Sequence, residues 1–212
     1  LAVVAPATPM IEHEGPGALL TATLGSHESS EAHGPRILIV PHRANLRGAV
    51  EMGATPAHLP GLAPIDDHAA RQRLSSLWQR PICADAGEEA AAMLGGVSAL
   101  VVVADDPAAN LLLPQRAAAA LHRLDCLVVL DAYMTPTASL AEVVLPIPAP
   151  GEVDGTMTNL EGRVQTVAAA APPPSGARAA WQALSDLMTA VGLPAHYTSP
   201  VEIRREIASA IP

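Results

Sequence analysis

The feature that most constrains this protein is an alternation of short aliphatic runs with alanine-rich stretches of helical composition. The runs at residues 99–103 and 127–130 have no polar alternation, which is typical of strands buried on both faces of a sheet. Helical stretches at 88–94 and 113–124 precede them, and a further strand is expected at 143–145. Because strands joined through a helix run parallel, the alternation predicts a doubly wound, mostly parallel, Rossmann-like α/β sheet.

A smaller unit of the same kind is predicted at the beginning of the sequence. Strands at 1–4 and 37–40 flank a candidate helix at 17–24, and the polar segment 25–34 is expected to be an exposed loop. This βαβ pattern predicts that residues 1–60 are the remnant of a first Rossmann-like lobe.

Prolines and glycines divide the rest of the sequence. A cluster of them near residue 60 predicts a boundary, after which residues 61–171 form the main α/β lobe with a ligand-type crevice. Within that lobe, the Gly- and Asp-rich segment 151–162 is expected to be a turn-forming loop. Residues 172–212 begin with a proline run and continue into two helices, at 177–191 and 202–210, predicted to pack on the main lobe.

Composition excludes several functions. The formal net charge is −9, all twelve basic residues are arginine, and only 2% of residues are aromatic, which argues against nucleic-acid binding. Cys83 and Cys126 stand alone, which argues against a disulfide framework, a zinc site or an iron–sulfur ligand set within this segment. The longest apolar run, 97–104, is too short to span a bilayer. The start lacks a methionine and a signal-peptide pattern, and we expect a fragment of a longer intracellular protein.

Acidic residues follow the predicted strands. Ligands of open α/β sheets bind beyond the carboxyl ends of the strands, so these residues could line one crevice. Its expected members are Asp105, Asp106, Asp131, Glu152 and Asp154, with Arg163 as the main cation. Carboxylates there can accept N–H donors of a guanine edge, but turn formation and helix capping are the favoured alternative.

No motif in the sequence predicts catalysis. Gly15-Pro16-Gly17 lacks the third glycine of a dinucleotide fingerprint, and there is no Walker sequence or Gly-x-Ser-x-Gly elbow. The eight histidines are dispersed without metal-ligand spacing. The residues alone therefore predict no catalytic residue and no metal ligand.

The segment 127–165 resembles the molybdopterin oxidoreductase superfamily, which includes formate dehydrogenases, nitrate reductases and the large iron–sulfur subunit of NADH–quinone oxidoreductase. The resemblance lies in Leu-Asp-Ala-Tyr-Met-Thr-Pro-Thr-Ala, Ala-Glu-Val-Val-Leu-Pro and Gly-Thr-Met-Thr-Asn-Leu-Glu-Gly-Arg-Val-Gln. Supporting pieces are Asn-Leu-Arg-Gly-Ala from residue 45, Leu-Pro-Gly from 59 and Pro-Ser-Gly-Ala-Arg from 174.

The resemblance implies a fold similar to domains 1–3 of the formate dehydrogenase and DMSO reductase group. It also implies that a guanine-dinucleotide molybdenum cofactor would lie near the Asp105 turn, with a lysine at Val153 and an aspartate at Ala180. This sequence has neither of those two residues, and its crevice is therefore expected to be vestigial. The residues expected to line it are Asp105, Asp106, Asp131, Thr135, Gly155, Asn159 and Arg163.

The hypothesis favoured by these departures is a structural α/β module of the large iron–sulfur subunit of NADH–quinone oxidoreductase (respiratory complex I), which carries electrons from NADH to quinone. No cofactor is expected in this segment, and iron–sulfur clusters are expected elsewhere in the full-length protein. The implied partners are other subunits of a respiratory complex at the cytoplasmic face of the inner membrane. The alternative is a fragment of a formate dehydrogenase or nitrate reductase that binds molybdopterin guanine dinucleotide. A third hypothesis is a free-standing interaction domain.

Overall fold

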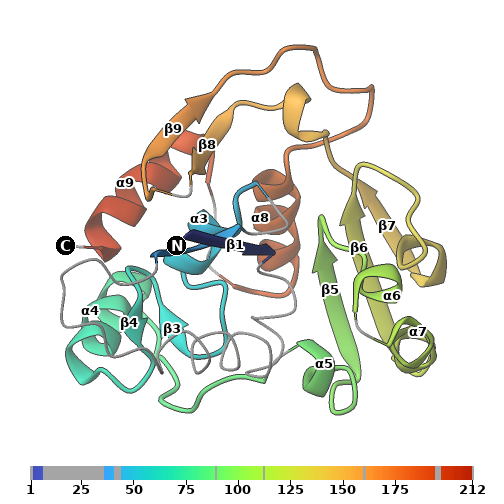
Figure 1. Ribbon diagram of the computed structural model, residues 1–212, viewed down its shortest axis with the longest axis horizontal. Helices are drawn as coiled ribbons and strands as arrows, with labels where there is room; N and C mark the ends of the chain where they lie inside the picture. The colour runs from blue at the N-terminus through green and yellow to red at the C-terminus, as the bar shows by residue number, and fades with distance from the viewer. Residues whose placement is uncertain are drawn as a thin grey trace.

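The computed structural model describes residues 2–6, 36–40, 44–88, 90–111, 113–159, 161–193 and 197–211 (Figure 1). The predicted helix at 17–24 and the loop at 25–34 lie outside these ranges. Strands β1 (Ala2–Pro6) and β2 (Arg36–Val40) pair in parallel, as the βαβ pattern predicts. The proposed division into three domains stays a prediction.

A three-stranded parallel sheet forms the centre of the α/β region. Its order is β5 (Ala99–Val103), β6 (Cys126–Asp131) and β7 (Val143–Pro146). The helices α5 (Ala90–Met93), α6 (Pro107–Asn110) and α7 (Pro114–Leu121) and the 3₁₀ turn η1 (Ala138–Leu140) come between or before the strands in the sequence. Pro114 occupies the first position of α7, where its missing N–H leaves no intrahelical bond unmade.

The two faces of β6 bury different side chains. Leu127 and Val129 pack in one cluster with Ala117 and Leu121 of α7. Leu130, on the opposite face, packs in another cluster against α8 (Ala180–Ala190). Helices therefore cover both faces of the sheet, which confirms the predicted α/β class (Figure 1).

Strand β5 differs from the prediction that it is buried on both faces. Val102 is 6% exposed, whereas Val101 and Val103 are 44% and 37% exposed. The reason is position, because β5 is an edge strand of the sheet and only its face toward the α7 cluster is covered. A run without polar alternation therefore does not distinguish a central strand from an edge strand.

A second apolar cluster joins distant parts of the sequence. Strands β3 (His58–Leu59) and β4 (Ala63–Pro64) form a short antiparallel pair beside α4 (His68–Trp78). Leu59, Ala70 and Leu74 are buried with Ala210 of α9 (Pro200–Ala210). Asp67 caps α4, because its side chain accepts from the N–H groups at positions 69 and 70 (2.9 and 3.2 Å).

The segment predicted as a turn-forming loop contains a strand. After the 3₁₀ turn η2 (Pro150–Glu152), β8 (Gly155–Thr158) pairs antiparallel with β9 (Val164–Val167). The turn residues only end the strands, while the threonines between them favour extended backbone. Helix α3 (Leu46–Glu51) contacts β8, and in Figure 1 the hairpin lies above α3 and beside α9.

Candidate functional site

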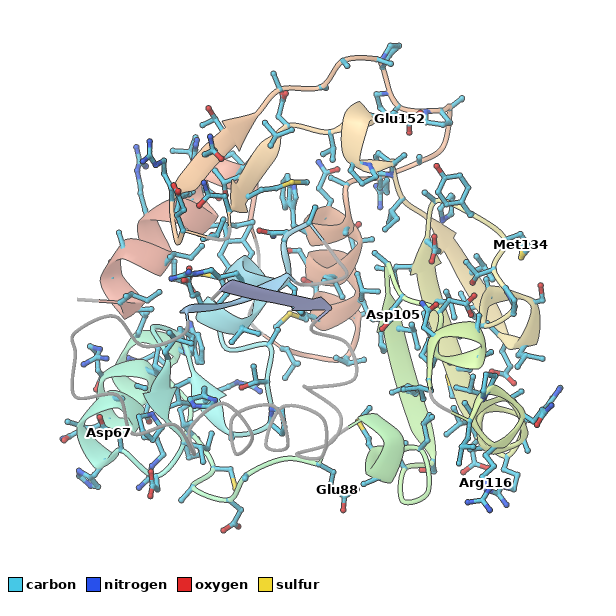
Figure 2. All side chains as sticks on the ribbon, viewed as in Figure 1. Asp67, Glu88, Asp105, Arg116, Met134 and Glu152 are labelled. Carbon is cyan, nitrogen blue, oxygen red and sulfur yellow. The ribbon has the colours of Figure 1, made fainter. Side chains whose placement is uncertain are left out.

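The two acidic turns lie at the carboxyl edge of the parallel sheet. Strands β5 and β6 are parallel neighbours, so the residues that follow them leave the sheet at one edge. The Ala104 N–H donates to the Leu130 carbonyl oxygen (2.8 Å), which fixes where the turn after β5 begins. The structure therefore places Asp105 and Asp106 at the same edge as Asp131, and Figure 2 shows Asp105 at the end of β5.

Asp106 is bound inside the protein by Thr137. The carboxylate oxygen Oδ1 of Asp106 accepts from the Thr137 N–H (3.0 Å) and from its hydroxyl (2.5 Å). The same hydroxyl oxygen accepts from the Ala108 N–H (2.9 Å), and Thr137 is completely buried. This network joins the start of α6 to η1, so Asp106 stabilises the loops that surround the sheet edge.

The other polar groups at this edge accept hydrogen bonds from nearby backbone. Asp105 Oδ1 accepts from the next N–H in the sequence (2.6 Å), and Asp131 Oδ1 accepts from the N–H two residues later (3.0 Å). Thr135 Oγ1 accepts from the N–H three residues later (3.1 Å). All three residues are half-buried. The arrangement matches the turn-forming and capping alternative, and it offers oxygen acceptors rather than a nucleophile.

The remaining predicted residues belong to the β8–β9 hairpin. Gly155 begins β8, and Asn159 and Arg163 lie in the turn that joins the two strands. Asn159 Oδ1 accepts from the N–H groups of Glu161 (3.0 Å) and Arg163 (2.9 Å), which closes the turn. The Arg163 guanidinium lies 3.8 Å from the Glu161 carboxylate, and both side chains are exposed.

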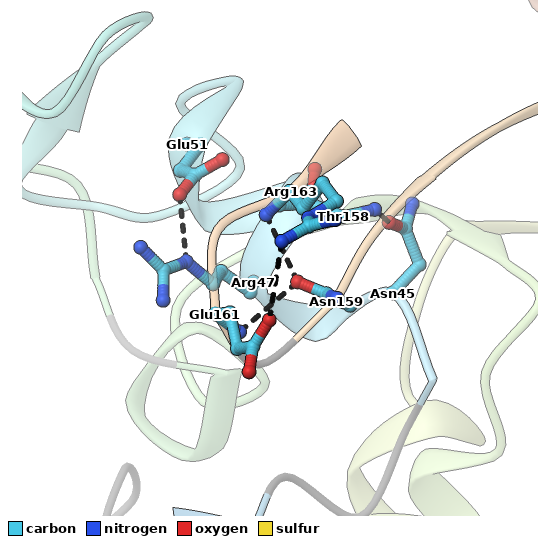
Figure 3. A network of polar contacts seen from close by, with 7 residues as sticks. All are labelled: Asn45, Arg47, Glu51, Thr158, Asn159, Glu161 and Arg163. Atoms are coloured by element: carbon cyan, nitrogen blue, oxygen red, sulfur yellow. Dashed lines mark hydrogen bonds and ion pairs between the residues drawn. The ribbon is translucent and has the colours of Figure 1, made fainter. Parts of the chain in front are cut away.

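Helix α3 anchors this hairpin through residues that the sequence did not assign to the site (Figure 3). The Thr158 N–H donates to Asn45 Oδ1 (2.9 Å), and Arg47 Nε donates to Glu51 (2.8 Å). A Cβ at Gly162 would lie 2.9 Å from the guanidinium carbon of Arg47, so glycine allows this close approach. The segment Asn-Leu-Arg-Gly-Ala was part of the resemblance to the family, but no local sequence pattern indicated that it would contact the hairpin.

The predicted residues thus fall into two hydrogen-bonded groups. Each of the hydrogen bonds given above lies within the sheet-edge group or within the hairpin group. Glu152 accepts from the Ala149 N–H (2.9 Å) and Asp154 from the Ala169 N–H (2.8 Å), so each closes its own local structure. A single crevice that contains both groups stays a prediction.

Two neighbouring cavities lie beside the hairpin. The first, of about 550 Å³, is lined by Glu152, Val153, Asp154, Trp181 and Gln182 together with alanines and prolines, and none of the described residues that line it is an arginine. The second, of about 610 Å³, shares Asp154 and Trp181 and is lined mainly by aliphatic residues and Arg204. The position at which the resemblance places a lysine therefore lines a cavity whose charged side chains, among the described residues, are carboxylates.

The shifted pKa values are found around α9. Tyr197 donates to Glu206 Oε1 (2.9 Å), and burial together with this carboxylate raises the pKa of Tyr197 to about 12. Trp78 of α4 donates to the same oxygen (2.7 Å). Hydrogen bonds from the Thr198 N–H and hydroxyl (both 2.7 Å) lower the pKa of Glu202. These groups connect α9 to α4 and to the preceding segment.

Neither a metal centre nor a membrane span is found among the described residues. They contain no group of three or more His, Cys, Asp or Glu side chains arranged to hold a metal ion. None of their helices combines the length and apolar composition needed to cross a bilayer.

A family model settles the classification. The model described as molybdopterin oxidoreductase matches residues 42–190, which include the parallel sheet, the β8–β9 hairpin and α8. This chain belongs to the molybdopterin oxidoreductase family. The resemblance inferred from the sequence is confirmed.

Curated relatives within this family differ in activity. The chain is 41% identical over 138 residues to the second G-type subunit of NADH-quinone oxidoreductase of Rhizobium meliloti (strain 1021), a match that covers 63% of this chain and 16% of the relative. It is 37% identical over 191 residues to the G-type subunit of NADH-quinone oxidoreductase of Streptomyces coelicolor (strain ATCC BAA-471 / A3(2) / M145). This match covers 84% of this chain and 22% of the relative. Formate dehydrogenase H of Escherichia coli (strain K12) is 30% identical over 203 residues, which are 92% of this chain and 27% of that relative. The chain therefore spans between a sixth and about a quarter of these relatives.

A solved structure is also similar. Acetylene hydratase from Pelobacter acetylenicus superposes with a TM-score of 0.43 at 21% identity, over 65% of this chain and 17% of that one.

Proposed function

We propose that this chain is a structural α/β module of the large iron–sulfur subunit of an NADH–quinone oxidoreductase. In this role it supports electron transfer from NADH to quinone, and the iron–sulfur clusters lie elsewhere in the full-length protein. Its partners are the other subunits of the complex, at the cytoplasmic face of the inner membrane. The names and sequence identities of the Rhizobium and Streptomyces relatives support this assignment.

The proposal includes the absence of a molybdenum cofactor from this segment. The observation that carries it is the lining of the 550 Å³ cavity beside Val153, where the described residues include Glu152 and Asp154 but no arginine, and the sequence has no lysine. A guanine-dinucleotide cofactor carries a pyrophosphate, and carboxylates without a cation do not suit that group. At the sheet edge, Asp105 and Asp106 each have an oxygen occupied by neighbouring donors of the protein.

A second candidate is a cofactor-binding fragment of a molybdopterin-dependent oxidoreductase. One observation favours it, because the match to formate dehydrogenase H covers 92% of this chain, more than the Rhizobium or the Streptomyces match. In that case the acceptors at the sheet edge would bind N–H donors of a guanine.

Metal and pterin analysis of the purified intact protein distinguishes the two. For the structural module we expect iron without molybdenum or tungsten, and no guanine nucleotide released on denaturation. Molybdenum or tungsten near one equivalent, together with released pterin, would overturn the proposal and support the alternative. Co-purification of subunits that carry flavin and iron–sulfur clusters is a further expected result.

A further inference from the structure

A largely apolar cavity lies between the β8–β9 hairpin and helix α9, which are neighbours in Figure 1. Its volume of about 610 Å³ is within the range of small-molecule sites, which is roughly 300–1,000 Å³. The hairpin forms one wall through Val167 and the cross-strand pair of Thr156 and Thr166. Trp181, near the start of α8, adds an indole to the lining.

Helix α9 forms another wall with one of its faces. Pro200, Ile203 and Ile207 line the cavity, and their three- and four-residue spacing places them on one side of the helix, together with Arg204. Both isoleucines are only partly buried, and Val201, which also lines the cavity, is 43% exposed. A ligand that covers these side chains removes apolar surface from water, so this wall favours an aliphatic ligand.

Arg204 supplies a positive charge on the α9 wall. Its side chain is exposed, so the guanidinium is accessible to a ligand that enters from solvent. Glu202, two positions earlier, is bound elsewhere, because its carboxylate oxygens accept from the Thr198 N–H and hydroxyl (both 2.7 Å). The α9 wall therefore combines apolar side chains with an accessible cation.

Asp154 brings a negative charge to another part of the same cavity. It also lines the neighbouring 550 Å³ cavity together with Glu152, and its Oδ1 accepts from the Ala169 N–H (2.8 Å). Arg204 lines the 610 Å³ cavity and is not among the residues of the other one. The carboxylates thus lie where the two cavities adjoin, and the guanidinium lies on α9.

We propose that this cavity binds an amphipathic carboxylate, namely an alkyl chain of medium length with a carboxylate at one end. The planar guanidinium of Arg204 presents paired N–H donors that match the two oxygens of a carboxylate. The alkyl chain packs against Trp181 and the two isoleucines of α9, where each methylene leaves water. The proposal does not depend on the function proposed above, which uses neither Arg204 nor α9.

Titration calorimetry of the intact protein with sodium octanoate, below its micellar concentration, tests the site. We expect saturable binding, and an affinity that rises about fourfold for each methylene added between butanoate and octanoate. Uncharged 1-octanol and cationic octylammonium have the same chain, and both should bind about tenfold more weakly, since they lack the charge-assisted hydrogen bonds to Arg204.

Two neighbouring arginines of α9 give a matched pair of variants. Arg204→Gln should weaken octanoate binding by about tenfold and leave octanol binding unchanged, because only the carboxylate uses the guanidinium. Arg205→Gln is the control, because Arg205 is exposed on the same helix but does not line the cavity, and its octanoate affinity should stay within about twofold of the parent.

Tryptophan fluorescence locates the bound chain. Octanoate should shift the emission to shorter wavelength, and Trp181→Phe should abolish this shift, whereas Trp78→Phe should keep it because Trp78 lies on α4 and donates to Glu206. Circular dichroism checks that each variant is folded, and if Arg204→Gln does not fold, the comparison of octanoate with octanol and octylammonium in the parent decides. The proposal is overturned by the absence of saturable binding, by equal losses in the two arginine variants, by octylammonium binding as tightly as octanoate, or by a shift that survives Trp181→Phe.

Discussion

The carboxyl edge of the sheet and the polar face of α4 are both rich in charged side chains, but they differ in how these are partnered. At the sheet edge, Asp106 accepts two hydrogen bonds from the buried Thr137, and Asp131 accepts from its own turn. On α4, the Nε of Arg71 is buried without an acceptor in the described ranges. At the carboxyl edge, which the sequence predicted as a ligand site, each aspartate thus accepts internal hydrogen bonds, whereas α4 has a buried donor without an acceptor among the described residues.

This difference teaches that the charge of a residue does not by itself indicate a binding site. An acidic turn after a strand is also what a protein needs to satisfy the N–H groups of the next loop. A donor that is buried without a partner is the more unusual feature, because such groups are rare in folded proteins. The following predictions test the contrast between the two regions.

The largest effect is expected at Asp106. Asp106→Ala removes the acceptor of a completely buried threonine, and we expect the free energy of unfolding to fall by about 2–3 kcal/mol. Chemical denaturation measures this change. Asp106→Asn is the matched control, since it retains one oxygen acceptor, and it should cost less than half as much. If the Asp106→Ala variant were as stable as the parent, the hydrogen bonds from Thr137 to Asp106 would not stabilise this edge of the sheet.

A smaller effect is expected where the segment before α9 meets Glu206 of that helix. Tyr197→Phe removes one hydrogen bond to Glu206 and should lower the free energy of unfolding by about 1 kcal/mol at neutral pH. Because folding raises the pKa of Tyr197 to about 12, its contribution is complete below pH 10 and is lost as the pH rises toward 12. Denaturation of parent and variant between pH 8 and about 11.5 should therefore show the difference shrinking with alkali. A difference that grows with pH would contradict the assigned hydrogen bond.

Asp131 provides the contrast to Asp106 within the same edge. Its carboxylate accepts from a turn N–H, and we expect Asp131→Ala to lower the free energy of unfolding by about 0.5–1 kcal/mol. If the protein is the proposed structural module, the assembled complex that carries this variant keeps nearly all of its NADH-dependent quinone reduction. Loss of turnover in a folded and assembled complex would instead assign a direct role to the sheet edge.

The smallest effect is expected at Arg71. Removing a donor that has no partner costs little, so Arg71→Met should change the free energy of unfolding by less than about 0.5 kcal/mol. Arg73→Met should cost about 1 kcal/mol, because Arg73 Nε donates to the Ala210 carbonyl oxygen. Thermal unfolding of both variants measures the two changes in stability. If Arg71→Met is the more harmful of the two, Arg71 has an internal partner and the contrast fails.

The amino-acid sequence alone determined the α/β class, the family and the positions of the main elements. The aliphatic run of β6, the proline at the start of α7 and Asp67 as the cap of α4 act through residues within a few positions of one another. Such signals are local, because strand and helix periodicity and capping depend on neighbours in the sequence.

Only the tertiary structure decided which surfaces are covered and which polar groups find partners. Val101 is exposed because β5 is an edge strand, although the aliphatic sequence of β5 resembles that of β6. The partners of Asp106 and of Asn45 lie 31 and 113 residues away in the sequence. Local periodicity does not encode such pairs, since packing of distant segments brings them together, and the same packing leaves Arg71 Nε buried without an acceptor among the described residues.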